Sequence, residues 1–339
     1  MTASALEQAR KLIEDGRINI VLADTDEKLY VRARATSASH YAEAVVSGSH
    51  DNISGAFLDG WPVKGFKEKS SGSRGGHSPR IPEGAARKMT VADIWEFANK
   101  VPLEEIEFLM DSVTMNKALV KEGLEREYGL KVGRTIADPE NSAFYGDTLL
   151  AYAMSCTAAA TDARMAGSTL PAMSNSGSGN QGITVTVPVI AVAEKTGSSH
   201  EQLIRALAIA HTVAIHIKGY LGKLSALCGC VVASTGAACG IVYLKGGGYD
   251  EICSAIKNMI GNITGMVCDG AKVGCALKVA SGVACAMQSS ILALAGSCIS
   301  PKDGIIEKDI EKTISNLGRL GSIGMQVADK MILDIMECK

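Results

Sequence analysis

The sequence predicts an α+β protein in which a small domain of strands and one helix precedes a large, almost wholly helical domain. Hydrophobic residues alternate with period two near the N-terminus and recur with helical period through most of the chain after residue 90. In addition, 47% of the residues are hydrophobic, but only 4% are aromatic and 36 are glycine. Because a core without large rings gains apolar contact through close backbone approach, this composition favours helices packed on helices.

Residues 1–64 are expected to form the small α+β domain. A helix should end near Gly16, because Leu6, Ala9 and Ile13 share one helical face before it. Strands are expected next, where apolar and polar residues alternate and a turn at residues 24–27 separates the first two. The expected strands are residues 17–23, 28–36 and 41–46.

Residues 65–89 are expected to be a linker or mobile loop, because they are rich in Ser, Gly, Lys and Arg and contain few apolar residues. Residues 90–339 should form the helical domain. Thr90 with Asp93 three residues later predicts a capping box at its first helix. Further helices are expected over residues 203–217, 249–260 and 308–336.

Two apolar stretches, residues 224–244 and 279–300, run about twenty residues without a charge, which is near the length that a bilayer requires. Gly, Ser, Thr and Cys dilute both stretches, and no aromatic belt flanks them. We expect central helices that are buried on all sides.

The charge balance argues against two classes of partner. Lys plus Arg number 34 and Asp plus Glu number 36, which gives a net charge of −2 without a long block of one sign. Nucleic acid and anionic membranes are therefore not expected as partners. The first 16 residues are amphipathic and charged rather than a secretory signal, so we expect a cytoplasmic protein with reduced thiols.

The cysteines are clustered. All ten lie at or after Cys156, and eight fall within the 71 residues from Cys228 to Cys298. No CxxC pair is present, which disfavours a zinc ribbon or a ferredoxin. Cys268 and Cys275 would share a helical face unless the residues between them make a turn. Four thiols, Cys228, Cys230, Cys268 and Cys275, could supply three ligands to an iron–sulfur cluster, or they could be packing residues.

A glycine-rich segment, SNSGSGNQG, spans residues 174–182. It matches GxGxxG formally, but no strand precedes it and no acidic residue follows at the spacing that a dinucleotide site needs. Its unshielded backbone N–H groups would suit a carboxylate, whereas a simple turn between helices is the alternative. The candidate binding residues are Ser174, Asn175, Ser176, Gly177, Ser178 and Asn180.

Candidate bases precede Cys228. His211 and Lys218 lie seven residues apart and would share one face of a helix, although a lone histidine is more often a core residue. Further candidates with weaker support are His216, Lys223, the run His50-Asp51-Asn52, and Asp162 with Arg164.

These segments resemble a known family. Residues 174–182, IKGYLGKLSALCGCVVAS at 217–234, GMVCDGAKVGCALK at 265–278 and residues 282–295 are similar to the iron–sulfur L-serine dehydratase alpha-chain family, and more closely to its L-cysteine desulfidase branch. The resemblance covers most of residues 90–339. The small domain is similar to the middle portion of family members.

The resemblance implies β-elimination from a small L-amino acid. L-Cysteine would give pyruvate, ammonia and sulfide, and L-serine or L-threonine are the alternative substrates. Three thiolates would hold a 4Fe–4S cluster, easily lost in air, whose open iron acts as a Lewis acid while a base, Lys218 or His211, removes the Cα proton. Cys268 and Cys275 match two ligand positions, and the third is Cys228 or Cys230. The loop at 174–182 would bind the substrate carboxylate.

The chain departs from the family in one respect. Members usually begin with a segment carrying a Gly-Cys-Thr-Glu-Pro motif, but here no cysteine precedes Cys156. The chain could be shortened, a separate chain could supply the segment, or the chemistry could be lost. The last case predicts a non-catalytic homologue that binds a cluster or an amino acid, and a helical scaffold with inert cysteines is a further alternative. We expect a homodimer.

Overall fold

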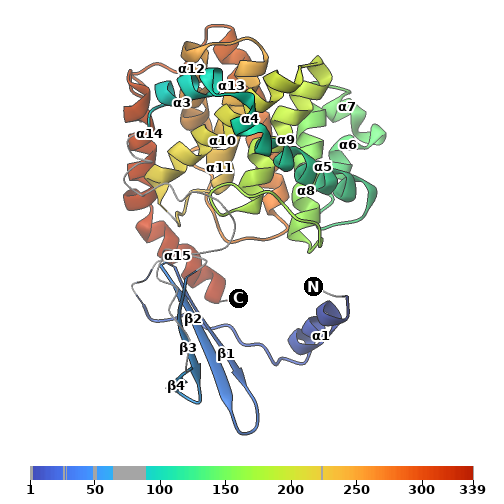
Figure 1. The fold of residues 1–339 in the computed structure, drawn as a ribbon, viewed down its shortest axis with the longest axis vertical. Coiled ribbons are helices and arrows are strands. Elements are labelled where there is room, and N and C mark those ends of the chain that lie inside the picture. Colours follow the sequence, from blue (N-terminus) through green and yellow to red (C-terminus); the bar gives the residue numbers. More distant parts are fainter. Residues whose placement is uncertain are drawn as a thin grey trace. The chain divides into compact units, whose positions relative to one another are not determined.

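The computed structural model describes residues 3–25, 27, 29–48, 52–63, 89–222 and 224–338 (Figure 1). The chain divides into two compact units, residues 1–80 with 333–339 and residues 81–332. The α+β class expected from the sequence is confirmed. The expected linker lies outside the described residues except for Met89, as do His50, Asp51 and Lys223.

The first unit contains one helix and a four-stranded antiparallel sheet in sequential order. These elements are α1 (Ala3–Glu14), β1 (Tyr30–Thr36), β2 (Tyr41–Ser47), β3 (Ile53–Leu58) and β4 (Trp61–Pro62). The strands expected over residues 28–36 and 41–46 are confirmed by β1 and β2. Their alternating side chains pair across the sheet, with Val31 opposite Val46.

The strand expected over residues 17–23 is wrong, because this segment is irregular and pairs with no described strand. Ile20 and Val21 are 94% and 83% exposed, so the apolar pattern buries nothing within the unit. The strands β3 and β4 were not expected. They are joined by Asp59 and Gly60, both at positive φ, which is the two-residue turn that Asp-Gly favours in hairpins.

The second unit is helical. Its long helices are α3 (Val91–Lys100), α5 (Met110–Glu125), α8 (Leu149–Met165), α9 (Gly179–Thr196), α10 (His200–Leu221), α11 (Gly229–Leu244), α12 (Tyr249–Ile263), α13 (Cys275–Leu294) and α14 (Ile310–Arg319). Short helices are α4 (Leu103–Ile106), α6 (Val132–Ala137) and α7 (Ser142–Tyr145), and α15 (Gln326–Glu337) ends the chain.

The capping box expected at Thr90 is confirmed. The Thr90 side chain accepts from the Asp93 backbone N–H, and the Asp93 carboxylate accepts from the Thr90 N–H. The single helix expected over residues 308–336 is instead divided by a π-helical turn at Leu320–Gly324. Gly321 lies so close to Leu221 that a Cβ there would overlap it, so the turn is shaped by packing on α10.

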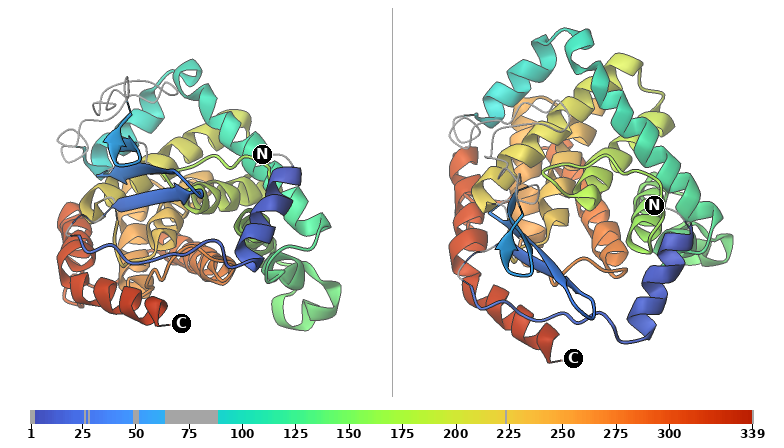
Figure 2. Two further views of the ribbon diagram at one scale, coloured as in Figure 1. Left: turned by 90° about the horizontal axis from the view of Figure 1, so that it is seen from below. Right: turned by 60° about the horizontal axis from the view of Figure 1, so that its bottom comes forward.

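Helix α11 is the centre of the core and packs against α9, α10, α12 and α13. Figure 2 shows the yellow helices α10 and α11 in the middle of this unit and α14 at its edge. A Cβ at Gly236 would overlap the carbonyl oxygen of Ala210, and one at Gly240 would lie 2.8 Å from that of Ala206. These two contacts are the close backbone approach that the composition predicted.

Burial on all sides is confirmed for α11 but is wrong for α13. Leu277, Ile291 and Leu292 on α13 are 55%, 62% and 43% exposed, because α8, α11 and α12 cover only part of its circumference. By length and apolar composition, α13 is the one helix of the described chain that could cross a membrane, and half of its apolar stretch is buried in the unit.

Helix α9 is built from poor helix formers. Its centre is the β-branched run Ile183–Val187 followed by Pro188, which has no N–H to donate to the preceding turn. Every residue from Gln181 to Ala193 is buried. Packing against α8, α10 and α11 therefore overrides the local preference for extended structure.

Candidate functional site

The glycine-rich segment forms a tight turn that leads into α9. Asn175 and Ser178 exchange backbone hydrogen bonds of 3.1 and 3.0 Å, and the two residues between them, Ser176 and Gly177, both have positive φ. The Ser178 hydroxyl accepts from the Gln181 N–H and caps the helix. The turn thus presents its backbone at the positive end of the α9 dipole, where an anion is favoured.

His211 lies beneath this turn. Its Nδ1 is 3.1 Å from Asn175 Nδ2, and its Nε2 is 3.1 Å from Thr186 Oγ1. Burial lowers the pKa of His211 to about 4, so the ring is neutral at pH 7. Nδ1 then accepts from the Asn175 amide, and Nε2 donates to Thr186. Both ring nitrogens are therefore occupied, Nδ1 by Asn175 and Nε2 by Thr186, and Asn175 is itself only 3% exposed.

Arg164, at the end of α8, lies against the start of α9. Its Nη1 donates to Asn180 Oδ1 at 3.0 Å, and its Nε occupies the space that a Cβ at Gly179 would need. No carboxylate among the described residues pairs with this guanidinium. An arginine beside a helix N-terminus is a strong arrangement for binding a carboxylate. Arg164 was only a weak candidate from the sequence. The feature of the sequence that could have indicated it is Gly179, because the arginine side chain occupies the space that a larger residue would need there.

Two short segments bring Cys228 and Cys268 together. The Cys228 N–H donates to Met266 O at 2.9 Å, and the Cys268 N–H donates to Ala226 O at 2.6 Å. Cys268 lies in a loop and Cys275 is the first residue of α13. They therefore do not share a helix face, and the turn alternative considered for the residues between them is correct.

Cys228 and Cys230 differ in their surroundings. Burial raises the pKa of the Cys228 thiol. Cys268 and Cys275 raise this pKa further, and Lys278 lowers it. The Cys230 thiol points into the core, where it donates to Lys278 O at 3.2 Å and lies 2.5 Å from the Cβ position of Gly282. Its pKa is raised well above the usual range by burial.

Lys218 reaches this region from α10. Burial lowers its pKa, and the nearby Cys268 and Cys228 oppose that shift. No carboxylate in the described part of the chain pairs with it. Lys218 is thus a partly buried amine beside two thiols with no counter-charge that would keep its proton in place.

Asp269 braces the loop between Cys268 and Cys275. Both Lys272 and Lys278 form ion pairs with its carboxylate, and their hydrogen bonds hold the pKa of Asp269 well below its usual range. Lys278 also donates to Val267 O at 2.9 Å. The loop that carries the two cysteines is therefore tied to the first turn of α13.

The first turns of α9, α11 and α13 are in contact, and we call them the three helix starts. The Gln181 side chain of α9 lies 2.8 Å from the Cβ position of Gly229, the first residue of α11. Cys230 of α11 contacts α13 at Lys278 and Gly282. Neither Cys228 nor Gly274 caps the helix that follows it. Three positive dipole ends near thiols favour thiolate and bound anions.

Among the residues that the structure describes, the cysteines and other possible ligands do not form a site for a single metal ion. In the described ranges no three His, Cys, Asp or Glu side chains converge on a point that would hold a single ion. A 4Fe–4S cluster places each thiolate on a different iron, so its ligands need not converge. Cys228, Cys268 and Cys275 are free thiols, and the helix starts around them are positive, which fits the chemistry of such a cluster.

Comparison with known proteins identifies the family. The family model described as "Serine dehydratase alpha chain" matches residues 8–334. A UPF0597 protein of Oleidesulfovibrio alaskensis is 46% identical over 339 residues, which cover all of this chain and 78% of the relative. UPF0597 proteins of Bacteroides fragilis and Porphyromonas gingivalis are 42% and 40% identical, covering 100% and 98% of this chain and 77% of each relative. The chain belongs to the serine dehydratase alpha chain family.

Proposed function

We propose that this protein catalyses an iron–sulfur-dependent β-elimination from a small L-amino acid, most readily L-cysteine, to give pyruvate, ammonia and sulfide. The family is one of lyases, which supports the reaction class. The observation that carries the proposal is the contact between the glycine-rich turn and the cysteine region, made by Gln181 against Gly229. The turn proposed to bind the carboxylate thus adjoins the start of α11, which Cys228 precedes.

Cys228, Cys268 and Cys275 would hold the 4Fe–4S cluster, and Cys230 would be a packing residue. The cluster, when bound, supplies a Lewis acid for the leaving group. Choosing Cys228 over Cys230 rests on their surroundings. The Cys230 thiol is buried and donates to Lys278 O of α13, whereas both Cys268 and Cys275 influence the Cys228 thiol.

The turn at residues 174–182 would bind the substrate carboxylate. Backbone N–H groups at the start of α9 and the unpaired Arg164 guanidinium supply positive charge there. Ser174, Ser176, Ser178 and Asn180 would supply further hydrogen bonds. His211 would act as a positioning residue that fixes Asn175, because both of its nitrogens are already occupied.

Lys218 would act as the base. Its lowered pKa increases the fraction of neutral amine relative to an ordinary lysine, and the amine nitrogen takes the Cα proton as the bond from Cβ to sulfur breaks. Hydrosulfide leaves, and the resulting 2-aminoacrylate tautomerises and is hydrolysed by water to pyruvate and ammonia. The rate should therefore rise with pH through the lowered pKa of Lys218.

L-Serine is the second candidate substrate, favoured by the description of the family. The phrase "alpha chain" in that description also supports a separate chain that would supply the Gly-Cys-Thr-Glu-Pro segment. A homodimer in the cytoplasm remains a prediction from the sequence.

The experiment is anaerobic reconstitution of the full chain, with iron and acid-labile sulfide measured before activity. We expect about four iron and four sulfide per chain, with pyruvate and sulfide released from L-cysteine faster than pyruvate from L-serine. Cys268→Ala should lose the iron, whereas Cys253→Ala, an equally half-buried thiol, should keep it. Iron retained by Cys268→Ala would refute the ligand set. A loaded chain that releases product from neither amino acid would refute the enzyme assignment.

A further inference from the structure

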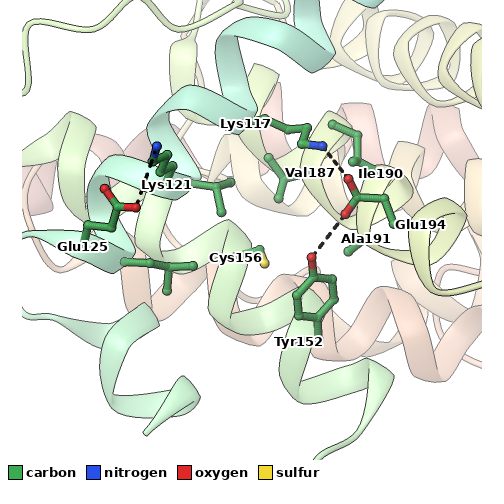
Figure 3. A pocket seen from close by; sticks show the side chains of 11 residues that line it. Lys117, Lys121, Glu125, Tyr152, Cys156, Val187, Ile190, Ala191 and Glu194 are labelled. Carbon is green, nitrogen blue, oxygen red and sulfur yellow. Dashed lines mark hydrogen bonds and ion pairs between the residues drawn. The ribbon is translucent and has the colours of Figure 1, made fainter.

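A cavity lies between α5, α8 and the later turns of α9, and Cys228, Cys268 and Cys275 are not among its lining residues (Figure 3). Its volume is about 290 Å³, which is at the lower end for small-molecule sites. It is lined by Lys117, Val120, Lys121, Leu124, Glu125, Tyr152, Cys156, Val187, Ile190, Ala191 and Glu194.

The floor of the cavity is aliphatic. Val187, Ile190 and Ala191 of α9 are 2–3% exposed, and Cys156 of α8 is 5% exposed. Burial raises the pKa of Cys156 to about 11, so its thiol is neutral at pH 7. Because no charged group lies on this floor, a saturated carbon chain suits it better than a polar one.

The rim of the cavity carries charged and hydroxyl side chains that contact one another. Lys117 Nζ lies 2.6 Å from Glu194 Oε1, and the Tyr152 hydroxyl lies 3.1 Å from Glu194 Oε2. Both oxygens of Glu194 thus already have a partner, as Figure 3 shows, and Lys117 balances the charge of this carboxylate. Burial raises the pKa of Tyr152, which keeps its hydroxyl protonated as a donor.

The remaining charge on the rim is positive. Lys121 pairs with Glu125 only at 3.9 Å, with side chains 74% and 62% exposed, and such a pair contributes little. Lys195 lies 4.6 Å from the centroid of the Tyr152 ring and pairs with no carboxylate of the described chain. The lining residues include two lysines and two glutamates, and Lys195 beside Tyr152 adds a further positive charge. Lys121 can bind an anionic group without breaking a strong contact.

We propose that this cavity binds a small aliphatic monocarboxylate, with its carboxylate at Lys121 and its hydrocarbon chain on the floor formed by α8 and α9. The site is separate from the proposed carboxylate site at residues 174–182, which lies at the opposite end of α9. The lysine at the rim favours a carboxylate head group, and the apolar floor favours the hydrocarbon chain of the ligand.

The test is calorimetric titration of the full chain with hexanoate, 1-hexanol and hexylamine. Hexanoate should bind saturably, hexanol at least about ten-fold more weakly, and hexylamine not at all. Arg164→Ala should leave hexanoate binding unchanged, which separates this site from the proposed active site. Equal binding of hexanoate and hexanol, or loss of binding in Arg164→Ala, would overturn the proposal.

Two variants test whether Lys121 and the cavity floor bind hexanoate. Lys121→Glu should weaken hexanoate binding at least about ten-fold. Its matched control is Lys100→Glu on α3, since Lys100 is equally exposed at 74% and also pairs with a glutamate four residues away. Ala191→Phe should fill the cavity and abolish binding, and Lys121→Glu decides the question if that variant does not fold.

Other outcomes would refute the proposal. Unchanged affinity in Lys121→Glu would mean that the carboxylate is not bound at this rim. A lower oligomeric state of folded Ala191→Phe, measured by light scattering, would mean that a second copy of the chain covers the floor.

Discussion

Four helices of the second unit, α3, α8, α10 and α14, begin differently from α11 and α13, the two helices that begin beside Cys228 and Cys275. At the outer starts, of α3, α8, α10 and α14, a side chain accepts from a backbone N–H of the first turn; these caps are Thr90, Thr148, Ser199 and Asp309. At the inner starts, of α11 and α13, the residues before the helix are Cys228 and Gly274, and neither caps it. A cap contributes about 1 kcal/mol, and α11 and α13 lack this contribution, as α5 and α12 also do.

The two kinds of helix start differ in what accepts a hydrogen bond from their first backbone N–H groups. The first N–H groups of any helix have no partner inside it. At each outer start a side chain accepts from one of them. At α13 the first three N–H groups instead donate to carbonyl oxygens of the preceding turn, and at α11 the Val231 N–H donates to Cys228 O. The contrast is therefore between side-chain caps at the outer starts and backbone acceptors at the inner starts, beside which Cys228 and Cys275 lie.

The largest effect is expected from capping an inner start. Cys228→Asn places a good N-cap residue where the backbone is already extended (φ −62°, ψ 130°). The iron-free chain should become about 1 kcal/mol more stable. Reconstituted protein should lose its iron and at least about a thousand-fold in activity, because Lewis-acid assistance contributes several kcal/mol. Iron content, activity and urea unfolding measure the three effects.

The matched control is Cys239→Ala, a thiol in the middle of the same helix with no exposed surface. It should lower stability by about 1 kcal/mol and leave iron unchanged. If Cys228→Asn kept its iron and Cys230→Ser lost it, the choice between these two cysteines would be reversed.

The next effect concerns the start of α9. A Cβ at Gly182 would overlap the carbonyl oxygen of Met173, which belongs to the backbone and cannot rotate away. Gly182→Ala should therefore destabilise the chain by about 3 kcal/mol. Gly219→Ala, in the exposed last turns of α10 with nothing within 4 Å, should stabilise it by about 0.5–1 kcal/mol. Similar unfolding midpoints for the two variants would show that the turn is not packed on α9 as described.

A pH-dependent effect is expected from His211. Its pKa is about 4 in the folded chain and about 6.5 when unfolded, so between these values the unfolded chain binds more protons. Stability should fall as pH decreases from 6.5 to 4, and this residue should account for about 3 kcal/mol of the loss. His211→Gln should remove that part of the slope.

Thr186→Val is the control for this measurement, because it removes the hydroxyl beside Nε2 and keeps the ring. It should lower stability at every pH and preserve the slope. An unchanged slope in His211→Gln would contradict the buried, neutral state of this histidine.

The smallest effect is expected at an outer start. Ser199→Ala breaks the capping box that Ser199 forms with Gln202 at the start of α10 and should cost about 1 kcal/mol at any pH, without any change in iron content. Ser315→Ala, inside α14, should change stability by less than about 0.5 kcal/mol. A loss of iron in Ser199→Ala would break the distinction between the two kinds of helix start.

Features of the fold that depend on residues close together in the sequence were predictable from it. The capping box at Thr90 and Asp93 and the paired strands β1 and β2 follow from short-range patterns. The strand expected over residues 17–23 failed because alternation alone supplies no partner strand. The exposed face of α13 could not be predicted either, because it depends on how many helices surround it.

The candidate site was predictable in composition but not in arrangement. The cysteines and the turn at residues 174–182 could be named from their motifs. Cys228 and Cys230 could not be told apart, because they differ in which one contacts α13. Arg164 was undervalued, since it lies fifteen residues before Gly179 and meets it only through the packing of α8 on α9.

The sequence of α9 has a consequence for the order of folding. A segment of β-branched residues followed by proline does not hold a helix on its own, because short helices of even good formers are marginal in water. We therefore expect α9 to become helical only after α8, α10 and α11 have assembled around it. The turn that begins α9 would then be among the last structures to form on the folding pathway, and a newly made chain would acquire this glycine-rich turn after its core.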